Sequence, residues 1–423
     1  MIATLQIYID GKWIVAGTFD SRGGIAAGGY LEYDQDFVFD NVENSPGCRM
    51  GLRYPVNFEL YQESRWPAFL LDILPTGAGR RVWTRRLGLT DGEGADWQLL
   101  LNGAGNPPGN LRVAEAAIPP AGSHPGFTKE EVVEKNVDFI EYAEARGAVV
   151  AGATDVAGDA PKFLLARDHK RRWHPDGALE DRDILDSWLV KFPRGKTDAD
   201  RMVLRNEAPY YEVARSFGIR TGKPLEFIDD ALFIPRFDRE AQGGKLVRHG
   251  LETLSSAAGI AVYGRRGDHA DFCAAITAYS SDAKSDLLEY LRREILNVAL
   301  RNTDNHGRNS AFVKYADGGV MLSPLYDFAP MFLDPEGIAR ASRWSEALEP
   351  AIGRPAWGEI VKSLHRYIDQ EEAVAFLAEH RVKVENLPET MQECGVEDKV
   401  IQLVARRCGE IAADLREAVQ GAG

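Results

Sequence analysis

The chain has few cysteines and lacks the segments that mark secreted or membrane proteins. Its four cysteines, Cys48, Cys273, Cys394 and Cys408, are widely scattered, and none stands in a CxxC or other metal-ligand spacing. We therefore expect free thiols, as is usual in a reducing cytoplasm. No basic segment followed by an apolar run opens the sequence, and no stretch approaches the apolar length of a membrane span. These features predict a cytoplasmic protein that does not enter a membrane.

The chain also lacks the basic excess of a free-standing nucleic-acid binder. Its formal net charge is −14, whereas a DNA-binding domain presents a basic face to the phosphates. We therefore expect DNA contact only through a small local patch or indirectly, through a partner. Neither a Walker A sequence nor a GxGxxG motif is present, so any phosphate-binding loop must be of another kind.

The 423 residues are more than one ordinary domain needs. A stretch at 118–127 containing proline and glycine is the best linker candidate. We predict an α+β protein in three parts: an N-terminal subdomain over 1–117, a small mixed α/β lobe over 118–230, and a large helical lobe over 231–423. Such a length can bury a substantial core without disulfides.

Hydrophobic spacing and turn residues predict the main elements. Alternation around Ile7 and a turn at Asp10-Gly11 predict a hairpin near the start. Pro75 and Gly218 are typical residues after a helix end. Helices are expected over 66–74, 129–146, 200–217 and 285–300, and strands over 162–166, 184–192, 231–234, 311–313 and 320–322.

The sharpest chemical motif is Asn302-Thr-Asp304-Asn-His306-Gly-Arg-Asn309, which directly follows an apolar helix. A short predicted hairpin separates it from Asp327, so the three polar side chains are expected at one edge. Phosphoryl transfer requires a carboxylate to take the hydroxyl proton, and an Asn oxygen and a second carboxylate to hold Mg²⁺. Asp304 is thus the candidate base, on a loop that solvent should reach, and Asn309 and Asp327 are candidate metal ligands.

The same residues also permit a simpler interpretation. Asp304 and Asn309 could merely cap turns of a polar loop. His306 could be catalytic, or it could form only local hydrogen bonds. Asp327 placed after a hairpin is what favours the phosphotransfer interpretation over the structural one.

Two lysines are candidates for phosphate binding. Lys191 lies within an apolar predicted strand, where a buried ammonium needs an anion unless its stem reaches water at the sheet edge. Glu207, at the start of the next helix, could pair with it or remain solvated. Lys162 follows a loop of small residues at 150–161, whose backbone N–H groups could cradle phosphates. The alternative is a surface loop followed by a charge at the start of a strand.

In this order, the motifs resemble the HipA family of bacterial toxin kinases over nearly the whole chain. The matching segments are Asp10-Gly-Lys-Trp13, Leu70-Leu-Asp-Ile-Leu-Pro75, Val156-Ala-Gly-Asp-Ala-Pro-Lys162, Val190-Lys-Phe-Pro193, Asn206-Glu207, Pro235-Arg-Phe-Asp-Arg239, Asn302 to Asn309, and Pro324-Leu-Tyr-Asp327. The resemblance implies a bilobal, protein-kinase-like fold. It also implies ATP and Mg²⁺ as cofactors, with nucleotide contacts from Val156, Ala157, Gly158, Lys162, Lys191, Ile234, Phe237 and His306.

The resemblance further implies transfer of phosphate to Ser or Thr of a cellular protein. Family targets include aminoacyl-tRNA synthetases, whose inactivation arrests growth and leads to persistence, and the usual partner is a small DNA-binding antitoxin, HipB. Four residues depart from the family pattern: Asp155 replaces the self-phosphorylated loop Ser, Ala160 and Pro161 precede Lys162, and Pro235 opens the hinge. Thr154 is the remaining loop hydroxyl. A stand-alone homologue, a phosphotransferase for a small molecule or lipid, and a non-catalytic pseudokinase are the alternatives.

Overall fold

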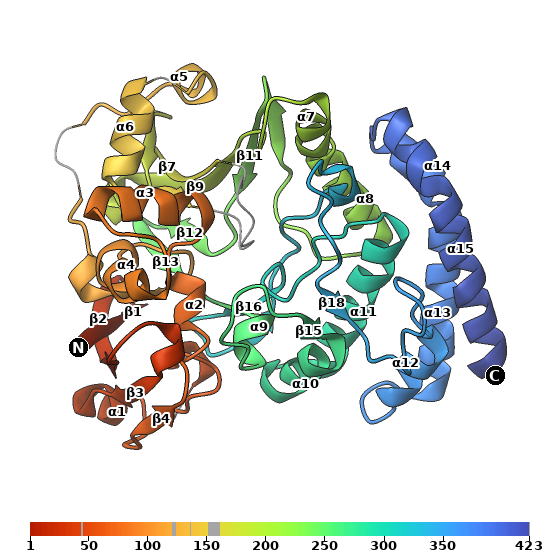
Figure 1. Ribbon diagram of the computed structural model, residues 1–423, viewed down its shortest axis with the longest axis horizontal. Helices are drawn as coiled ribbons and strands as arrows, with labels where there is room; N and C mark the ends of the chain where they lie inside the picture. Colours follow the sequence, from red (N-terminus) through yellow and green to blue (C-terminus); the bar gives the residue numbers. More distant parts are fainter. Residues whose placement is uncertain (44, 121–123, 136, 151–160, 423) are drawn as a thin grey trace. The chain divides into compact units, whose positions relative to one another are not determined.

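The chain forms two compact units, neither of which is continuous in the sequence. The computed structural model describes residues 1–43, 45–120, 124–135, 137–150 and 161–422 (Figure 1). Unit 1 comprises Met1–Gly195, Leu225–Gly264 and Ala311–Met321, and unit 2 comprises Lys196–Pro224, Arg265–Ser310 and Leu322–Gly423. The three-part division at 118 and 231 is a different partition and stays a prediction.

The N-terminal sheet of unit 1 begins with the predicted hairpin. Strands β1 (Ile2–Ile9) and β2 (Lys12–Asp20) pair antiparallel, with Ile9 opposite Lys12. Asp10 and Gly11 have φ of 50° and 83°, as a two-residue type I′ turn requires. The sheet has the order β4-β3-β2-β1-β5. Its other strands are β3 (Gly29–Tyr33), β4 (Tyr61–Glu63) and β5 (Leu111–Val113).

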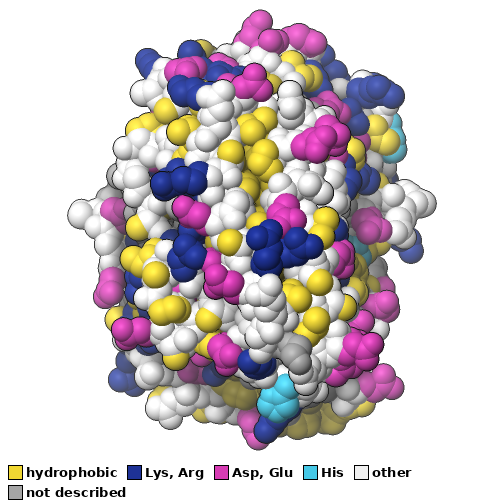
Figure 2. Space-filling model, turned by 90° about the vertical axis from the view of Figure 1, so that its right-hand side faces the viewer, with side chains coloured by type: hydrophobic (Ala, Val, Ile, Leu, Met, Phe, Trp, Pro, Cys, Tyr) yellow, Lys and Arg dark blue, Asp and Glu magenta, His cyan; other side chains and the backbone are white. Residues whose placement is uncertain are grey.

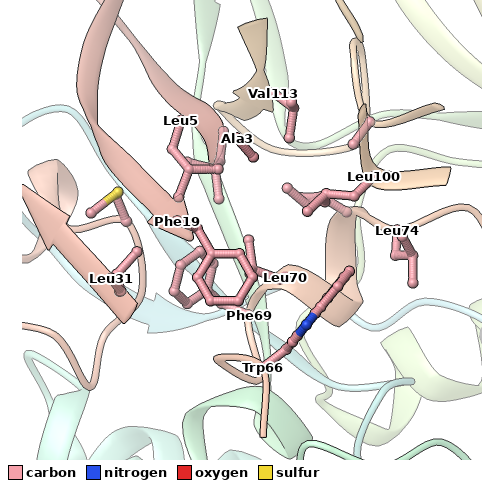
Figure 3. Close-up of a cluster of buried hydrophobic side chains, with 14 of the residues drawn as sticks. Ala3, Leu5, Phe19, Leu31, Trp66, Phe69, Leu70, Leu74, Leu100 and Val113 are labelled. Carbon is pink, nitrogen blue, oxygen red and sulfur yellow. The ribbon is translucent and has the colours of Figure 1, made fainter. Parts of the chain in front are cut away.

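Apolar side chains of this sheet pack against short helices to form the first core. Figure 3 shows strand residues such as Leu5, Phe19 and Leu31 grouped with Trp66 and Leu100, all of them buried. The helices of this part are α1 (Gln35–Asp40), α2 (Leu70–Ile73), α3 (Gly77–Leu87) and α4 (Asp96–Gly103). Burial of large side chains of this kind stabilises by about 1.5–3 kcal/mol each.

The helix predicted over 66–74 is shorter than expected. Only Leu70–Ile73 is α-helical, and tight i→i+3 bonds precede it, from Leu70 N to Pro67 O (3.0 Å) and from Leu71 N to Ala68 O (3.1 Å). Bonds of this type make 3₁₀-like turns that do not extend far. The prediction that the segment ends before Pro75 is confirmed.

A second sheet in unit 1 has the order β10-β11-β9-β7-β6, with β8 paired to β7. Its strands are β6 (Val149–Val150), β7 (Lys162–Asp168), β8 (Trp173–Pro175), β9 (Ile184–Lys191), β10 (Glu226–Ile228) and β11 (Ala231–Pro235). Two helices, α5 (Lys129–Val133) and α6 (Val137–Ala145), replace the single helix predicted over 129–146. The three strands predicted for this region are confirmed.

The remainder of unit 1 consists of short strands and one short helix. The bounds are β12 (Arg239–Gln242), β13 (Lys245–Arg248), β14 (Gly250–Thr253), α9 (Leu254–Ala257), β16 (Ala311–Lys314) and β17 (Val320–Leu322). The last two form the hairpin that was predicted between Asn309 and Asp327, and they join β14 in a three-stranded sheet.

Unit 2 is mainly helical. Its elements are α7 (Asp198–Arg205), α8 (Glu207–Phe217), β15 (Gly267–Asp268), α10 (His269–Tyr279), α11 (Ala283–Ala299), β18 (Ser342–Arg343), α12 (Trp357–Ser363), α13 (Gln370–Glu385), α14 (Leu387–Glu393) and α15 (Asp398–Ala422). Helix α11 packs on α10, α13 and α15, which makes it central to this unit.

The helix predicted over 200–217 is interrupted at Asn206. Pro209 explains the break, because a proline ring clashes with the carbonyl four residues earlier, here that of Arg205. Proline is tolerated in the first turn of the new helix α8, which ends before Gly218 at φ 95° as predicted. The predicted helix over 285–300 is confirmed as α11.

The cysteines are free thiols, as expected from the sequence, and charged side chains of both signs lie on the surface. All four cysteines are free, and Cys273 and Cys408 are buried. Helix α15 carries Arg407 and Arg406, both paired with Glu410 (3.1 and 3.4 Å). On the face drawn in Figure 2, basic and acidic side chains are interspersed. Within the described parts of the chain, no helix has both the length and the apolar character that crossing a bilayer demands.

Buried ion pairs hold the segment after β11 to the N-terminal part of unit 1. Arg236 pairs with Asp238 (2.7 Å) and with Asp176, and Arg239 pairs with Asp238 (2.9 Å). Gly109 N donates to Asp238 (2.8 Å), and Gly109 O accepts from Arg239 (2.6 Å). Although burial alone favours the protonated acid, the Arg236 and Arg239 guanidiniums hold the pKa of Asp238 well below its usual value.

We expect Asp238→Asn to lower the free energy of unfolding by about 3–5 kcal/mol at pH 7, because it leaves two buried guanidiniums short of a negative partner. The folded-state pKa of Asp238 is depressed, so its contribution is present above the unfolded value of about 3.9 and is lost as pH falls through the folded value. Urea unfolding at pH 7 and below pH 4 measures this.

The matched control is Glu144→Gln, which breaks the exposed ion pair of Glu144 with Arg85 in the same unit. An exposed pair contributes less than about 1 kcal/mol. Equal effects of the two substitutions at pH 7 would contradict the role assigned to the buried ion pairs.

Candidate functional site

Three neighbouring strands of the second sheet bring the predicted phosphate-binding lysines together. Lys162 of β7 lies directly opposite Lys191 of β9, and Lys191 lies opposite Leu232 of β11. Directly opposite residues point to the same face of a sheet, and so do residues two apart on one strand. Ile234, two residues after Leu232, therefore shares this face with both lysines. We call Lys162, Lys191 and Ile234 the lysine face.

The opposite face of the same strands is apolar. Phe163, Val190 and Phe233 alternate with the residues of the lysine face and pack in one buried cluster with Phe139 of α6. A shift of register by one residue would place the lysines in this core. Burial of the aromatic face thus fixes which way Lys162 and Lys191 point.

The two lysines are buried as well as adjacent, with 8 % and 5 % of their surface exposed. Like charges directly opposite each other on a sheet repel, and removal from water disfavours an ammonium. An anionic group shared by the two side chains lowers the electrostatic free energy of both. The lysine face is therefore a largely buried basic surface, and the phosphate contacts expected of Lys162 and Lys191 stay predictions.

The other predicted nucleotide contacts in unit 1 differ in their placement. Phe237 is partly exposed and stands among the buried charges of Arg236 and Asp238, directly after β11. Residues 154–158, which include Thr154, Asp155 and the three small loop residues predicted to contact phosphate, lie outside the described residues. Their roles remain predictions.

In unit 2, the loop over 301–310 directly follows α11, as predicted. Asn302 N donates to Asn297 O (2.9 Å), which extends the helix end into the loop. Asn309 Nδ2 donates to Asp304 O (2.7 Å), and Asn309 N donates to His306 O (2.9 Å). These bonds close the loop on itself and fix the separation of Asp304 and Asn309.

Asp327 is brought to the same loop from beyond the β16–β17 hairpin. Its neighbour Tyr326 donates from its hydroxyl to Arg308 O (2.7 Å). Asn309, His306 and Asp327 all line one cavity of about 20 Å³, roughly the space of a single water or small ion. Asp327 has φ of 56°, a left-handed conformation that Asp tolerates better than most residues.

Asp304 differs from expectation in one respect. It was expected on a loop that solvent reaches, yet only 7 % of its surface is exposed. The loop closure through Asn309 draws it inward. His306 Nε2 lies 3.4 Å from Asp304 Oδ1, so the two side chains are neighbours although His306 forms no short hydrogen bond there.

The donor set fits Mg²⁺ better than a soft metal. Asn309 and Asp327 offer an amide oxygen and a carboxylate, and Mg²⁺ is typically held by one or two carboxylates together with substrate phosphates and waters. The part of the chain that the structure describes contains no group of three or more His, Cys, Asp or Glu side chains arranged for a metal. Glu207 is buried in unit 2 and Lys191 lies in unit 1, so their pairing stays a prediction.

Several polar residues around the loop were not identified from the sequence. Glu294 of α11 accepts hydrogen bonds from Asn305 Nδ2 (3.1 Å) and Asn297 Nδ2 (2.9 Å). Arg340, from a segment after Asp327, also donates to Glu294 (3.0 Å). The available signal was that Glu294 and Asn297 share a helical face with apolar residues such as Leu287 and Leu291, and that further polar residues of the helix are buried as well.

Comparisons with known proteins bear on the family and the fold of the chain. A family model described as the HipA-like C-terminal domain matches residues 154–412. The chain is 24 % identical over 338 residues to the putative kinase Y4mE of Sinorhizobium fredii (strain NBRC 101917 / NGR234), covering 77 % of each chain. A solved structure of Shewanella oneidensis MR-1 HipA, in a complex with HipB and operator DNA, superposes with a TM-score of 0.64 at 16 % identity. That match covers 98 % of this chain and 97 % of the other.

The fold is therefore the α+β, protein-kinase-like bilobal fold of HipA, as predicted. The family model covers more than half of the chain, so the protein belongs to the HipA-like family. The resemblance seen in the sequence motifs is confirmed at the level of family and fold.

We expect Mg·ATP to raise the melting temperature of the wild type and to raise that of Lys162→Met or Lys191→Met much less. A bound ligand stabilises by RT ln(1 + [L]/Kd), and a lost charge-assisted contact weakens binding by about 1.5–3 kcal/mol. Differential scanning fluorimetry with and without Mg·ATP measures the shift.

Lys170→Met serves as the control, because Lys170 is exposed in the turn after β7. Its ligand-induced shift should equal that of the wild type. If all three variants respond to Mg·ATP like the wild type, the lysine face does not bind the phosphates.

Proposed function

We propose that the protein is an ATP- and Mg²⁺-dependent serine/threonine protein kinase that acts as a toxin of the HipA type. The observation that carries this proposal is the convergence of Asn309 and Asp327 on one small cavity, with Asp304 in the same closed loop. These are the three residue types that phosphoryl transfer requires, and they come from two segments separated by a hairpin.

Each residue of the loop has a distinct task in this proposal. Asp304 accepts the proton of the substrate hydroxyl, and its buried position keeps the carboxylate oriented. Asn309 and Asp327 would hold Mg²⁺, which neutralises charge on the phosphates. The bond from Asn309 Nδ2 to Asp304 O leaves the amide oxygen of Asn309 to face a metal.

In this proposal, the lysine face of unit 1 binds the nucleotide. Lys162 and Lys191 would contact ATP phosphates, and Val156, Ala157 and Gly158 are further nucleotide contacts that the family resemblance implies. Ile234 on the same face and Phe237 just after β11 would contact the adenine. The apolar and basic character of this face is what an adenine ring followed by phosphates demands.

Relatives suggest the biological setting. Shewanella HipA is described in a complex with HipB and operator DNA, and the protein of Sinorhizobium is described as a putative kinase. We infer a HipB-like DNA-binding antitoxin as partner, with DNA contacted only through it. The substrate would be a cellular protein, such as an aminoacyl-tRNA synthetase, whose phosphorylation arrests growth.

We expect Asp304→Asn to lower the rate of phosphate transfer by about 10²–10⁴-fold, because it removes general-base catalysis. Asn has nearly the same shape, so the buried site should stay filled and the protein folded. Transfer of γ-labelled phosphate from ATP to lysate proteins measures the rate, with phosphoamino-acid analysis to identify Ser or Thr.

Asp271→Asn is the control, since Asp271 is exposed on α10 of the same unit. Label that appears in metabolites or lipids rather than protein would favour the small-molecule alternative. Normal transfer by a folded Asp304→Asn variant would refute the assignment of the base, and absence of transfer in the wild type would favour a pseudokinase.

We also expect Asp327→Asn to weaken Mg²⁺-dependent binding of ATP by at least about tenfold, whereas Asp304→Asn retains most of it. The reason is that only Asp327 is a proposed direct ligand of the metal. Isothermal calorimetry with a non-hydrolysable ATP analogue, with Mg²⁺ and with EDTA, compares the variants. Wild-type affinity in both variants would place the metal site elsewhere.

A further inference from the structure

A buried carboxylate beneath the candidate catalytic loop connects three segments of unit 2. Glu294 of α11 has only 3 % of its surface exposed. Its Oε1 accepts from Asn297 Nδ2 (2.9 Å), and its Oε2 accepts from Asn305 Nδ2 (3.1 Å) and Arg340 Nη2 (3.0 Å). Helix α11, the 301–310 loop and the segment after Asp327 therefore all hydrogen-bond to the carboxylate of Glu294.

The partners of Glu294 are all hydrogen-bond donors. His269 Nε2 lies 3.2 Å from Glu294 Oε2, and its Nδ1 lies 2.6 Å from the Tyr290 hydroxyl. Burial lowers the pKa of His269, so the ring is neutral near pH 7. With its proton on Nε2, the neutral ring donates to Glu294 and accepts at Nδ1 from Tyr290, and Arg340 Nη2 lies 3.4 Å from the same Nε2. Only a carboxylate, with acceptors on both oxygens, satisfies this set.

Arg340 extends the connection beyond the loop. Its Nη1 donates to Glu349 (3.1 Å), and Glu349 in turn accepts from the backbone N–H groups of Gly353 (2.6 Å) and Trp344 (3.1 Å). The guanidinium is largely buried between Glu294 and Glu349. The segment over 340–353 is thereby tied to Glu294.

The loop residue Asn305 depends on Glu294 for its orientation. Among the described residues, Asn305 Oδ1 and Asn302 Oδ1 are buried atoms without a hydrogen-bond partner. Their side-chain contacts therefore come from the Nδ2 atoms, to Glu294 and to Asn297 (2.9 Å) respectively. Asn305 follows Asp304 directly, and Glu294 and Asn305 line the same cavity as Asn309 and Asp327.

We propose that Glu294 is a positioning residue, which holds the loop between Asp304 and Asn309 in its reactive geometry and couples it through Arg340 to the segment over 340–353. This inference rests on the proposed kinase function and assigns it a further residue. Glu294 touches neither nucleotide nor metal in this scheme, and it acts through Asn305.

Glu294→Gln tests the inference, because the amide replaces one acceptor by a donor that faces other donors. A displacement of about 1 Å near a reacting group can cost on the order of 10²-fold in rate. We expect kcat to fall by about 10–100-fold while KM for Mg·ATP stays within about twofold. Arg340→Met should give the same pattern, and the double variant should lose little more than either single variant.

Glu289→Gln is the matched control. Glu289 is buried on the same helix, but it pairs with Arg292 and Arg293 and accepts from Arg220 N (2.9 Å). Within the described residues, these partners all lie outside the 301–310 loop. The Glu289→Gln variant should lose about as much free energy of unfolding as Glu294→Gln, without a fall in kcat. Equal kcat losses for Glu289→Gln and Glu294→Gln, or no loss for Glu294→Gln and Arg340→Met, would overturn the positioning role.

A second readout separates this inference from the kinase assignment. Amide hydrogen exchange over 301–310 should become faster in Glu294→Gln and in Arg340→Met and stay unchanged in Glu289→Gln. A wild type without phosphotransfer activity would refute only the proposed function. Amide hydrogen exchange over 301–310 would still test whether Glu294 positions the loop. Unchanged exchange in both Glu294→Gln and Arg340→Met would refute the positioning role even if the wild type is an active kinase.

Discussion

The alternation of side chains along β7, β9 and β11 is the constraint on which the placement of Lys162 and Lys191 depends. Phe163, Val190 and Phe233 are buried in the core on one face. Because successive residues point to opposite faces, Lys162 and Lys191 must point to the other, directly opposite each other. Burial of the apolar face, the dominant favourable term in folding, thus sets the two lysine side chains next to each other on the opposite face.

In unit 2, hydrogen bonds rather than strand alternation place the polar residues. Hydrogen bonds within the 301–310 loop join Asn309 to Asp304, and the Tyr326 hydroxyl brings Asp327 to Arg308. Beneath them, Glu294 connects the loop to α11 and to Arg340. Phosphoryl transfer depends chiefly on positioning and electrostatics, and a loop held on several sides meets that demand better than an exposed one.

Much of the fold followed from local sequence signals. The Asp10-Gly11 hairpin, the strands β7, β9 and β11, and helix α11 formed where turn chemistry and periodicity placed them. Two helices were misjudged in extent. Pro209 breaks the helix predicted over 200–217 at Asn206, and 3₁₀-like turns replace the first part of the helix predicted over 66–74. The roles of Asp304, Asn309 and Asp327 rest on motif spacing and remain predictions.

Other features could not be read from local patterns, because they depend on tertiary packing. The burial of Asp304 follows from loop closure, and the pairing of Lys162 with Lys191 follows from strand register. Other contacts join segments far apart in the sequence. Arg236 pairs with Asp176, Asp238 accepts from Gly109 N, and Glu294 accepts from Arg340. No spacing rule predicts such partners.

The most direct test of the account is a crystal structure of the protein with Mg²⁺ and a non-hydrolysable ATP analogue. The account predicts Mg²⁺ bound to the Asn309 amide oxygen and the Asp327 carboxylate at about 2.1 Å. It also predicts phosphate oxygens within hydrogen-bonding distance of Lys162 and Lys191. A nucleotide bound away from the lysine face, or a metal that touches neither Asn309 nor Asp327, would contradict it.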